Sequence, residues 1–120
     1  MMKTKQYILK DGLMLIDELD DRYNEYTKEK EITGISPDEM WNLDYSIAVF
    51  VLPRLKAFRK NKAGYPGCLN NMEEWNEILD TMILAFTLII NNDNVVFGEA
   101  EKDVEIGLGN FRDYFRSLWS

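Results

Sequence analysis

Histidine is absent from the chain, and cysteine occurs only once, as Cys68. Without histidine the chain lacks the commonest general base and zinc ligand. This excludes Ser-His-Asp and Cys-His nucleophile systems, and zinc sites of the usual Cys/His kind. A single cysteine excludes an internal disulfide and fits a reducing cytosol. The three prolines and seven glycines are also too few for a linker-rich or all-β chain.

Long apolar segments are missing as well. The longest run, residues 82–90, is interrupted by Thr87 and falls far short of the roughly 20 residues that a membrane-spanning helix needs. The first twelve residues lack the extended apolar region of a signal peptide. We therefore expect a cytoplasmic protein with no membrane association.

The charge balance is acidic, with 21 Asp and Glu residues against 14 Lys and Arg residues and a net charge of −7. Duplex nucleic acid is disfavoured as a partner, because neutralising phosphates needs clustered basic residues. At 120 residues and 46% hydrophobic content, the chain is long and apolar enough for a real core. We expect one domain over residues 1–120.

The first apolar stripe has two interpretations. Its members recur at spacings of three and four, which favours a helix running to about Glu29. The dipeptide Asp11-Gly12 competes with this interpretation, since it could turn a short hairpin through residues 7–15 or cap the helix. The stripe consists of Leu9, Leu13, Ile16, Leu19, Tyr23 and Tyr26.

Residues 36–91 predict two long helices joined by one loop. Ser36, Pro37 and Glu39 form a capping box with proline at the first helical position. Pro53 lies inside the helix that follows, so we expect a kink near residues 49–52. The predicted apolar face of this helix comprises Met40, Leu43, Ile47, Phe50, Val51 and Leu55.

The next two helices complete the predicted fold. Asn71 and Glu74 repeat the capping pattern before an almost wholly apolar helix that ends at Asn91. A last helix carries apolar residues from Phe97 to Leu118, and Gly107 and Gly109 inside it predict a close helix–helix approach. The expected fold class is an all-α, single-domain bundle of about four helices.

Several short motifs occur in a fixed order between residues 35 and 119. They are residues 41–44 (WNLD), 52–56 (LPRLK), 64–66 (GYP), 72–75 (MEEW), 80–82 (DTM) and the C-terminal pattern from Gly107 to Trp119. Together these motifs resemble a family of small bacteriophage proteins. The resemblance implies an origin in a phage or prophage and expression in the cytoplasm of an infected bacterium. It carries no catalytic residues over, and it leaves the N-terminal segment uncovered.

The third predicted helix carries the sharpest candidate for chemistry. Glu74, Glu77 and Asp80 advance by threes along one strip, and such carboxylates can hold Mg²⁺. The spacing is similar to the first motif of all-α nucleotide pyrophosphohydrolases of the MazG type. Those enzymes need a second helix with an ExxD motif, and the downstream acids at residues 99–105 lack that spacing. We therefore favour solvated acids and a helix start over a metal cage.

Two further features are candidates for binding. Asp44 stands in an apolar and aromatic segment; if buried it must be paired, with Arg54 or a tyrosine hydroxyl, and a polar pocket floor is the alternative. A basic run follows Pro53, beside Tyr65 in a Gly-Tyr-Pro-Gly turn, and could bind an acidic partner or merely face the acidic helices. Its members are Arg54, Lys56, Arg59, Lys60 and Lys62.

Three functional hypotheses remain. The first is a non-catalytic accessory protein that binds a host protein or a small anionic ligand, without a cofactor. The second is an Mg²⁺-dependent nucleotide hydrolase, and only this hypothesis needs a metal. The third is a structural or assembly subunit, in which Trp119 could anchor a homodimer contact.

Overall fold

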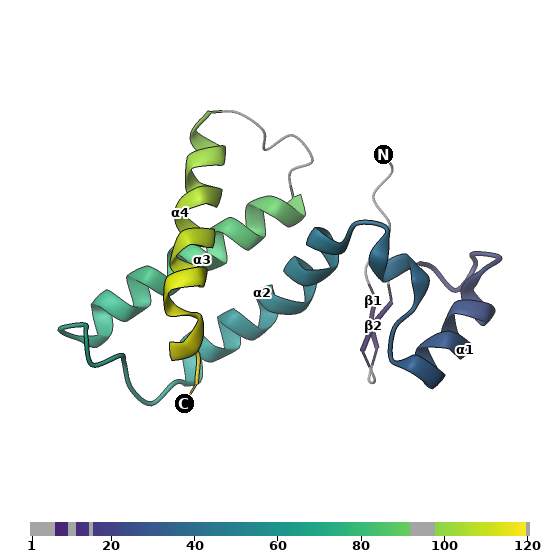
Figure 1. The fold of residues 1–120 in the computed structure, drawn as a ribbon, viewed down its shortest axis with the longest axis horizontal. Helices are drawn as coiled ribbons and strands as arrows, with labels where there is room; N and C mark the ends of the chain where they lie inside the picture. Colours follow the sequence, from purple (N-terminus) through teal and green to yellow (C-terminus); the bar gives the residue numbers. More distant parts are fainter. Residues whose placement is uncertain (1–6, 10–11, 15, 92–97, 120) are drawn as a thin grey trace. The chain divides into compact units, whose positions relative to one another are not determined.

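A computed structural model gives the fold of this chain and describes residues 7–9, 12–14, 16–91 and 98–119. Four α-helices lie in these residues, which confirms the all-α fold class (Figure 1). The chain divides into two compact units, Met1–Ile47 and Ala48–Ser120, and α2 (Leu43–Asn61) contributes to both. The prediction of one domain over residues 1–120 stays a prediction.

The first unit begins with a hairpin and not with the favoured helix. Strands β1 (Tyr7–Leu9) and β2 (Gly12–Met14) pair antiparallel, with Ile8 opposite Leu13, so the hairpin interpretation is confirmed. The turn at residues 10–11 lies outside the described residues. Helix α1 (Tyr23–Thr33) starts late and ends at Gly34, whose φ of 81° suits glycine.

Two aspartates explain the late start of α1. The Asp17 carboxylate accepts a hydrogen bond from the Leu19 amide (2.8 Å), and the Asp20 carboxylate accepts one from the Arg22 amide (2.9 Å). Short acidic side chains that bond the backbone two residues on stabilise turns at the expense of helix. The apolar stripe is broken there, and the Leu19 side chain is exposed.

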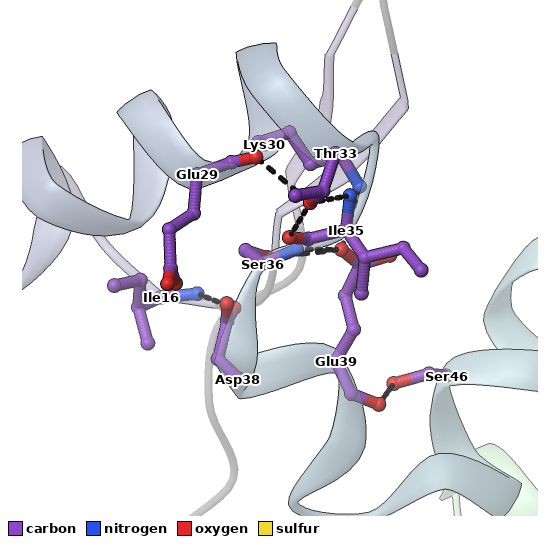
Figure 2. A network of polar contacts seen from close by, with 9 residues as sticks. All are labelled: Ile16, Glu29, Lys30, Thr33, Ile35, Ser36, Asp38, Glu39 and Ser46. Carbon is purple, nitrogen blue, oxygen red and sulfur yellow. Dashed lines mark hydrogen bonds and ion pairs between the residues drawn. The ribbon is translucent and has the colours of Figure 1, made fainter.

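The interior of the first unit is a polar network (Figure 2). The amide of Ile16 donates to the buried Asp38 carboxylate (3.1 Å), which ties the chain after β2 to the 3₁₀ turn η1 (Pro37–Met40). The Ser46 hydroxyl donates to the Glu39 carbonyl (2.7 Å) and ties η1 to α2. Ile16 and the polar residues Ser36, Asp38 and Ser46 are all buried in this unit, so directional bonds help to hold it together.

Glu39 joins the predicted cap to α1. Its carboxylate accepts hydrogen bonds from the Ser36 amide (2.6 Å) and hydroxyl (3.0 Å), which confirms the capping box. It also accepts one from Lys30 Nζ (2.7 Å), and both charged side chains are largely buried. Burial alone would raise the pKa of the Glu39 carboxyl, but the bonds from Lys30 and Ser36 outweigh it and hold that pKa below its ordinary value.

The second unit has an apolar core built around α3 (Met72–Asn91). Asn71 accepts a hydrogen bond from the Glu74 amide (2.8 Å), which confirms the predicted helix start. Helix α4 (Glu99–Tyr114) crosses α3 and continues into the 3₁₀ turn η2 (Phe115–Ser117) (Figure 1). The core residues are Ala48, Leu55, Leu69, Trp75, Leu79, Met82 and Phe86.

The crossing of α3 and α4 depends on Gly107. A Cβ there would overlap the Thr81 carbonyl oxygen and the Ala85 side chain, which confirms the close approach predicted for this glycine. At Gly109 a Cβ would meet nothing within 4 Å, so the same prediction is wrong for Gly109. Asn110 Nδ2 donates to the Thr81 hydroxyl (2.8 Å) beside the crossing. Phe97, predicted to open the last helix, lies outside the described residues.

Helix α2 differs from its prediction in which side chains it buries. Ala48, Val49 and Leu55 are buried, whereas much of the predicted apolar face is exposed. Burial depends on which elements pack against a helix, and periodicity alone does not supply that information. The kink predicted at Pro53 is not confirmed, since α2 continues through that residue as one helix. The helix predicted from Ser36 onward is divided into η1 and α2, so Met40 belongs to η1. The exposed members of the predicted face are Met40, Leu43, Ile47 and Phe50.

Candidate functional site

The basic run and the acidic helix meet at one ion pair in the second unit. Arg59 of α2 donates through Nε (2.6 Å) and Nη2 (3.2 Å) to the two carboxylate oxygens of Asp80 on α3. The side chains are 39% and 54% exposed, so the pair contributes less than about 1 kcal/mol to stability. Arg59 and Asp80 therefore neutralise each other, and the charges predicted to oppose one another partly do so.

Lys62 is also held inside the unit. Its ammonium group donates to the Asn76 side-chain oxygen and to the Arg59 carbonyl (2.7 Å). Burial lowers the pKa of Lys62, and the positive charge of Arg59 lowers it further. With Arg59, it forms the inner part of the basic run.

Lys56 and Lys60 form the outer part. Both side chains are exposed, and within the described ranges neither ammonium group has an acidic partner. Their spacing of four residues places them as neighbours on one helix face, where like charges are unfavourable by a few tenths of a kcal/mol. We call this pair the outer basic face.

The two remaining candidates on α2, Arg54 and Asp44, contact neighbouring residues of the same helix. Arg54 donates to the Phe50 carbonyl (2.8 Å), and its guanidinium lies 3.7 Å from the centroid of the Phe50 ring. Asp44 is exposed and accepts a hydrogen bond from the Tyr45 amide (2.9 Å). Asp44 therefore does not need the buried ion pair that the sequence suggested, because water solvates its charge.

The three candidate carboxylates of α3 do not converge on one point, as a metal site would require. Glu74 accepts a hydrogen bond from the Asn70 amide (3.2 Å) and belongs to the helix start, whereas Glu77 is exposed and Asp80 binds Arg59. Among the residues that the structure describes, no group of three His, Cys, Asp or Glu side chains is placed to hold a metal ion. The geometry thus gives no support to a magnesium site on this helix.

A pocket of about 500 Å³ lies where the loop after α2 meets the C-terminal turn. It is lined by residues 63–68, by Trp75 of α3, and by Ser117 and Trp119. Trp75 is buried, with its ring 6.3 Å from that of Phe58 and 5.6 Å from that of Tyr114. Trp119 is 75% exposed and Tyr65 is 45% exposed. The pocket therefore has two rings open to solvent, Tyr65 and Trp119, and is backed by the Trp75 ring, which is itself only 1% exposed.

The loop that builds the pocket is held by short-range bonds. The Leu69 amide donates to the Pro66 carbonyl (3.0 Å), and the Tyr65 hydroxyl contacts the Asn70 carbonyl at 3.4 Å. Leu69 is buried and anchors the loop in the core. The sequence predicted a defined turn here and named Tyr65, but it gave no sign that Trp119 would reach the same place.

The sequence also missed the polar interior of the first unit. Lys30 and Asp38 were not singled out, although a buried carboxylate or ammonium is uncommon and needs partners. The signal available was weak, since Asp38 follows Pro37 in the first turn of a helix, where an acid is ordinary. Trp41 is half exposed, and the Arg22 guanidinium lies 4.6 Å from the centroid of its ring.

A scan against protein-family models and searches of curated proteins and of solved structures found no match to this chain. In the described parts of the chain, no helix is both long enough and apolar enough to cross a membrane. The outer basic face and the pocket are therefore the features from which a function can be inferred.

Proposed function

We propose that this protein is a non-catalytic binding protein that recognises an acidic protein partner through the outer basic face, Lys56 and Lys60. The observation that carries the proposal is the division of the basic run. Arg59 is neutralised by Asp80 and Lys62 is held by Asn76, whereas the outer pair is exposed. Two adjacent like charges without internal compensation cost stability and are best explained by an external anion.

Charge complementarity favours a protein over a nucleic acid as the source of that anion. From residue 54 to residue 72 the chain has five basic residues and no acidic one, yet its net charge is −7. A local basic face on an acidic molecule attracts a small cluster of carboxylates, while the rest of the surface repels an extended phosphate backbone. The resemblance to phage proteins would place this partner in the cytoplasm of an infected bacterium.

A small anionic ligand and magnesium-dependent nucleotide hydrolysis are weaker alternatives. Lys56 and Lys60 lie on an open helix face, and small ligands are usually enclosed in concave sites. Hydrolysis would need Glu74, Glu77 and Asp80 to converge on one ion, but they serve a helix start, solvent and an ion pair respectively.

The test is affinity capture from host and infected-cell lysates with quantitative mass spectrometry. We compare the wild-type protein with the double variant Lys56→Glu/Lys60→Glu. The double variant Lys28→Glu/Arg112→Glu is the matched control, because it changes net charge equally at exposed positions elsewhere. Lysates at several salt concentrations give the ionic-strength dependence of capture.

We expect both the wild type and the control variant to capture one acidic protein that the Lys56/Lys60 variant does not capture. The amount captured should fall as the salt concentration rises. Equal recovery on both variants would contradict recognition by this face. Metal-dependent turnover of a nucleotide by the purified protein would contradict the non-catalytic assignment.

A further inference from the structure

The pocket beside the outer basic face has no role in the charge recognition described above. It is aromatic-walled, and its volume of about 500 Å³ falls in the range of protein pockets that bury a ligand group. We infer that this pocket receives one aromatic or large apolar side chain of the acidic partner segment, so that the partner is anchored there and oriented by Lys60. This inference rests on the proposed function and specifies the partner's chemistry.

The walls of the pocket suit a flat apolar group. Trp75 contacts Phe58 and Tyr114 in the core and is only 1% exposed, so it supports the pocket from behind without offering a free ring face. Trp119 and Tyr65 offer ring faces that remain largely open to solvent. Aromatic rings gain from edge-to-face or offset contacts with a further ring, beyond the apolar area that they bury. Exposed tryptophan and tyrosine beside a cavity are typical of the centre of a protein interface.

The pocket and the basic face lie close enough for one segment to reach both. Ala63, which lines the pocket, follows Lys60 by three residues, and three residues span at most about 10 Å. An extended peptide covers the same distance with about three residues of its own. The partner segment should therefore carry carboxylates within about three positions of its apolar anchor.

A second copy of this chain is a less suitable occupant than a different protein. Each copy carries a net charge of −7, so two copies repel at low ionic strength. Self-association through the pocket nevertheless gives a distinct experimental outcome, since it would depend on protein concentration and on Trp119.

The test uses two synthetic peptides and ¹⁵N-labelled protein in NMR titrations at low salt. The first probe is acetyl-Glu-Glu-Phe-Glu-Glu-amide, and the second replaces its phenylalanine with alanine. We expect the phenylalanine peptide to shift the amide signals of residues 64–68 and the Trp119 indole signal, saturably. Its affinity should exceed that of the alanine peptide by at least about tenfold, which corresponds to about 1.4 kcal/mol.

Three variants separate the pocket from the charged face. Trp119→Ala should lower the affinity for the phenylalanine peptide at least about fivefold and leave the affinity for the alanine peptide unchanged. Lys60→Glu should lower the affinity for both peptides. Phe115→Ala is the matched control, because Phe115 is an exposed aromatic residue of the same C-terminal turn that does not line the pocket. It should change neither affinity, and circular dichroism verifies that each variant is folded.

The outcomes distinguish the two proposals. Equal affinities for the two peptides, or a Trp119→Ala variant that binds the phenylalanine peptide normally, would overturn the anchor pocket and leave the basic face intact. If neither peptide binds, both proposals fail. Sedimentation showing a dimer that Trp119→Ala disrupts would overturn the anchor inference in favour of a second copy.

Discussion

The two glycines of α4 offer a matched pair of substitutions whose outcomes should differ in sign. Gly107 and Gly109 are two residues apart, which places them about 200° apart around the helix. A methyl group on Gly107 would overlap the Thr81 carbonyl oxygen and the Ala85 Cβ of α3, whereas one on Gly109 would meet open space. The same chemical change, glycine to alanine, therefore tests the helix crossing at one position and the helix alone at the other.

The magnitudes follow from two opposing effects. Alanine stabilises a helix interior by about 1 kcal/mol relative to glycine at either position. At Gly107 the overlap involves backbone as well as a side chain of α3, so no rotamer change relieves it and the two helices must separate. Such overpacking costs about 1–3 kcal/mol or more. We expect Gly107→Ala to lower the free energy of unfolding by about 2 kcal/mol and Gly109→Ala to raise it by up to about 1 kcal/mol.

Urea denaturation followed by tryptophan fluorescence measures both effects, because Trp75 lies in the core of the unit that contains the crossing. With a typical slope of about 1–3 kcal/mol per molar urea, the midpoints of the two variants should differ by about 1–3 M. If Gly107→Ala unfolds at the same urea concentration as Gly109→Ala, the close contact between α3 and α4 is not present in solution and the reasoning fails.

Two other perturbations test the charged contacts of each unit. The pKa of Glu39 is lowered in the folded state, so the carboxylate's contribution to stability is fully present above its ordinary pKa of 4.5 and is lost as pH falls through the folded value. Amide hydrogen exchange in α1 and η1 should therefore accelerate in acid, beyond the intrinsic change in exchange rate. Glu39→Gln should abolish this pH dependence, and an unaltered dependence in the variant would refute the role of Glu39. Asp80→Asn should lower the free energy of unfolding in urea by less than about 1 kcal/mol, because both side chains of the Arg59–Asp80 pair are partly exposed. A loss above about 2 kcal/mol would contradict that expectation.

Local signals made two capping bonds predictable. The bonds between Ser36 and Glu39, and between Asn71 and Glu74, form within four residues of chain and need no other element. The second starts α3 as predicted, whereas the first opens the 3₁₀ turn η1, and α2 itself begins only at Leu43. The hairpin at the N-terminus was not the favoured prediction, because the apolar spacing there indicated a helix and only the Asp11-Gly12 dipeptide indicated a turn. The turn-forming bonds of Asp17 and Asp20 decide against a helix, and composition alone does not show whether such bonds form.

Tertiary contacts made the rest unpredictable. Gly107 and Gly109 look equivalent in the sequence, and only the position of α3 distinguishes them. The apolar face of α2 was predicted from its period, but Leu43, Ile47 and Phe50 are exposed. Trp119 follows η2, which ends the last helix, and lines the pocket together with residues 63–68. The sequence of residues 63–68 alone does not predict that Trp119 lies beside them.

Helix geometry also explains why neighbouring members of the basic run have different surroundings. Arg59 and Lys60 are neighbours in sequence but lie about 100° apart around α2, so Arg59 meets Asp80 while Lys60 remains exposed.

The two units differ in the interactions that stabilise them, since one has a polar network around Asp38 and Glu39 and the other has an apolar core. Acid should therefore loosen the first unit before the second. Peptide binding near Lys60 should then decline only where the carboxylates of the peptide become protonated, and a decline that instead follows the loosening of α1 would show that recognition needs the first unit.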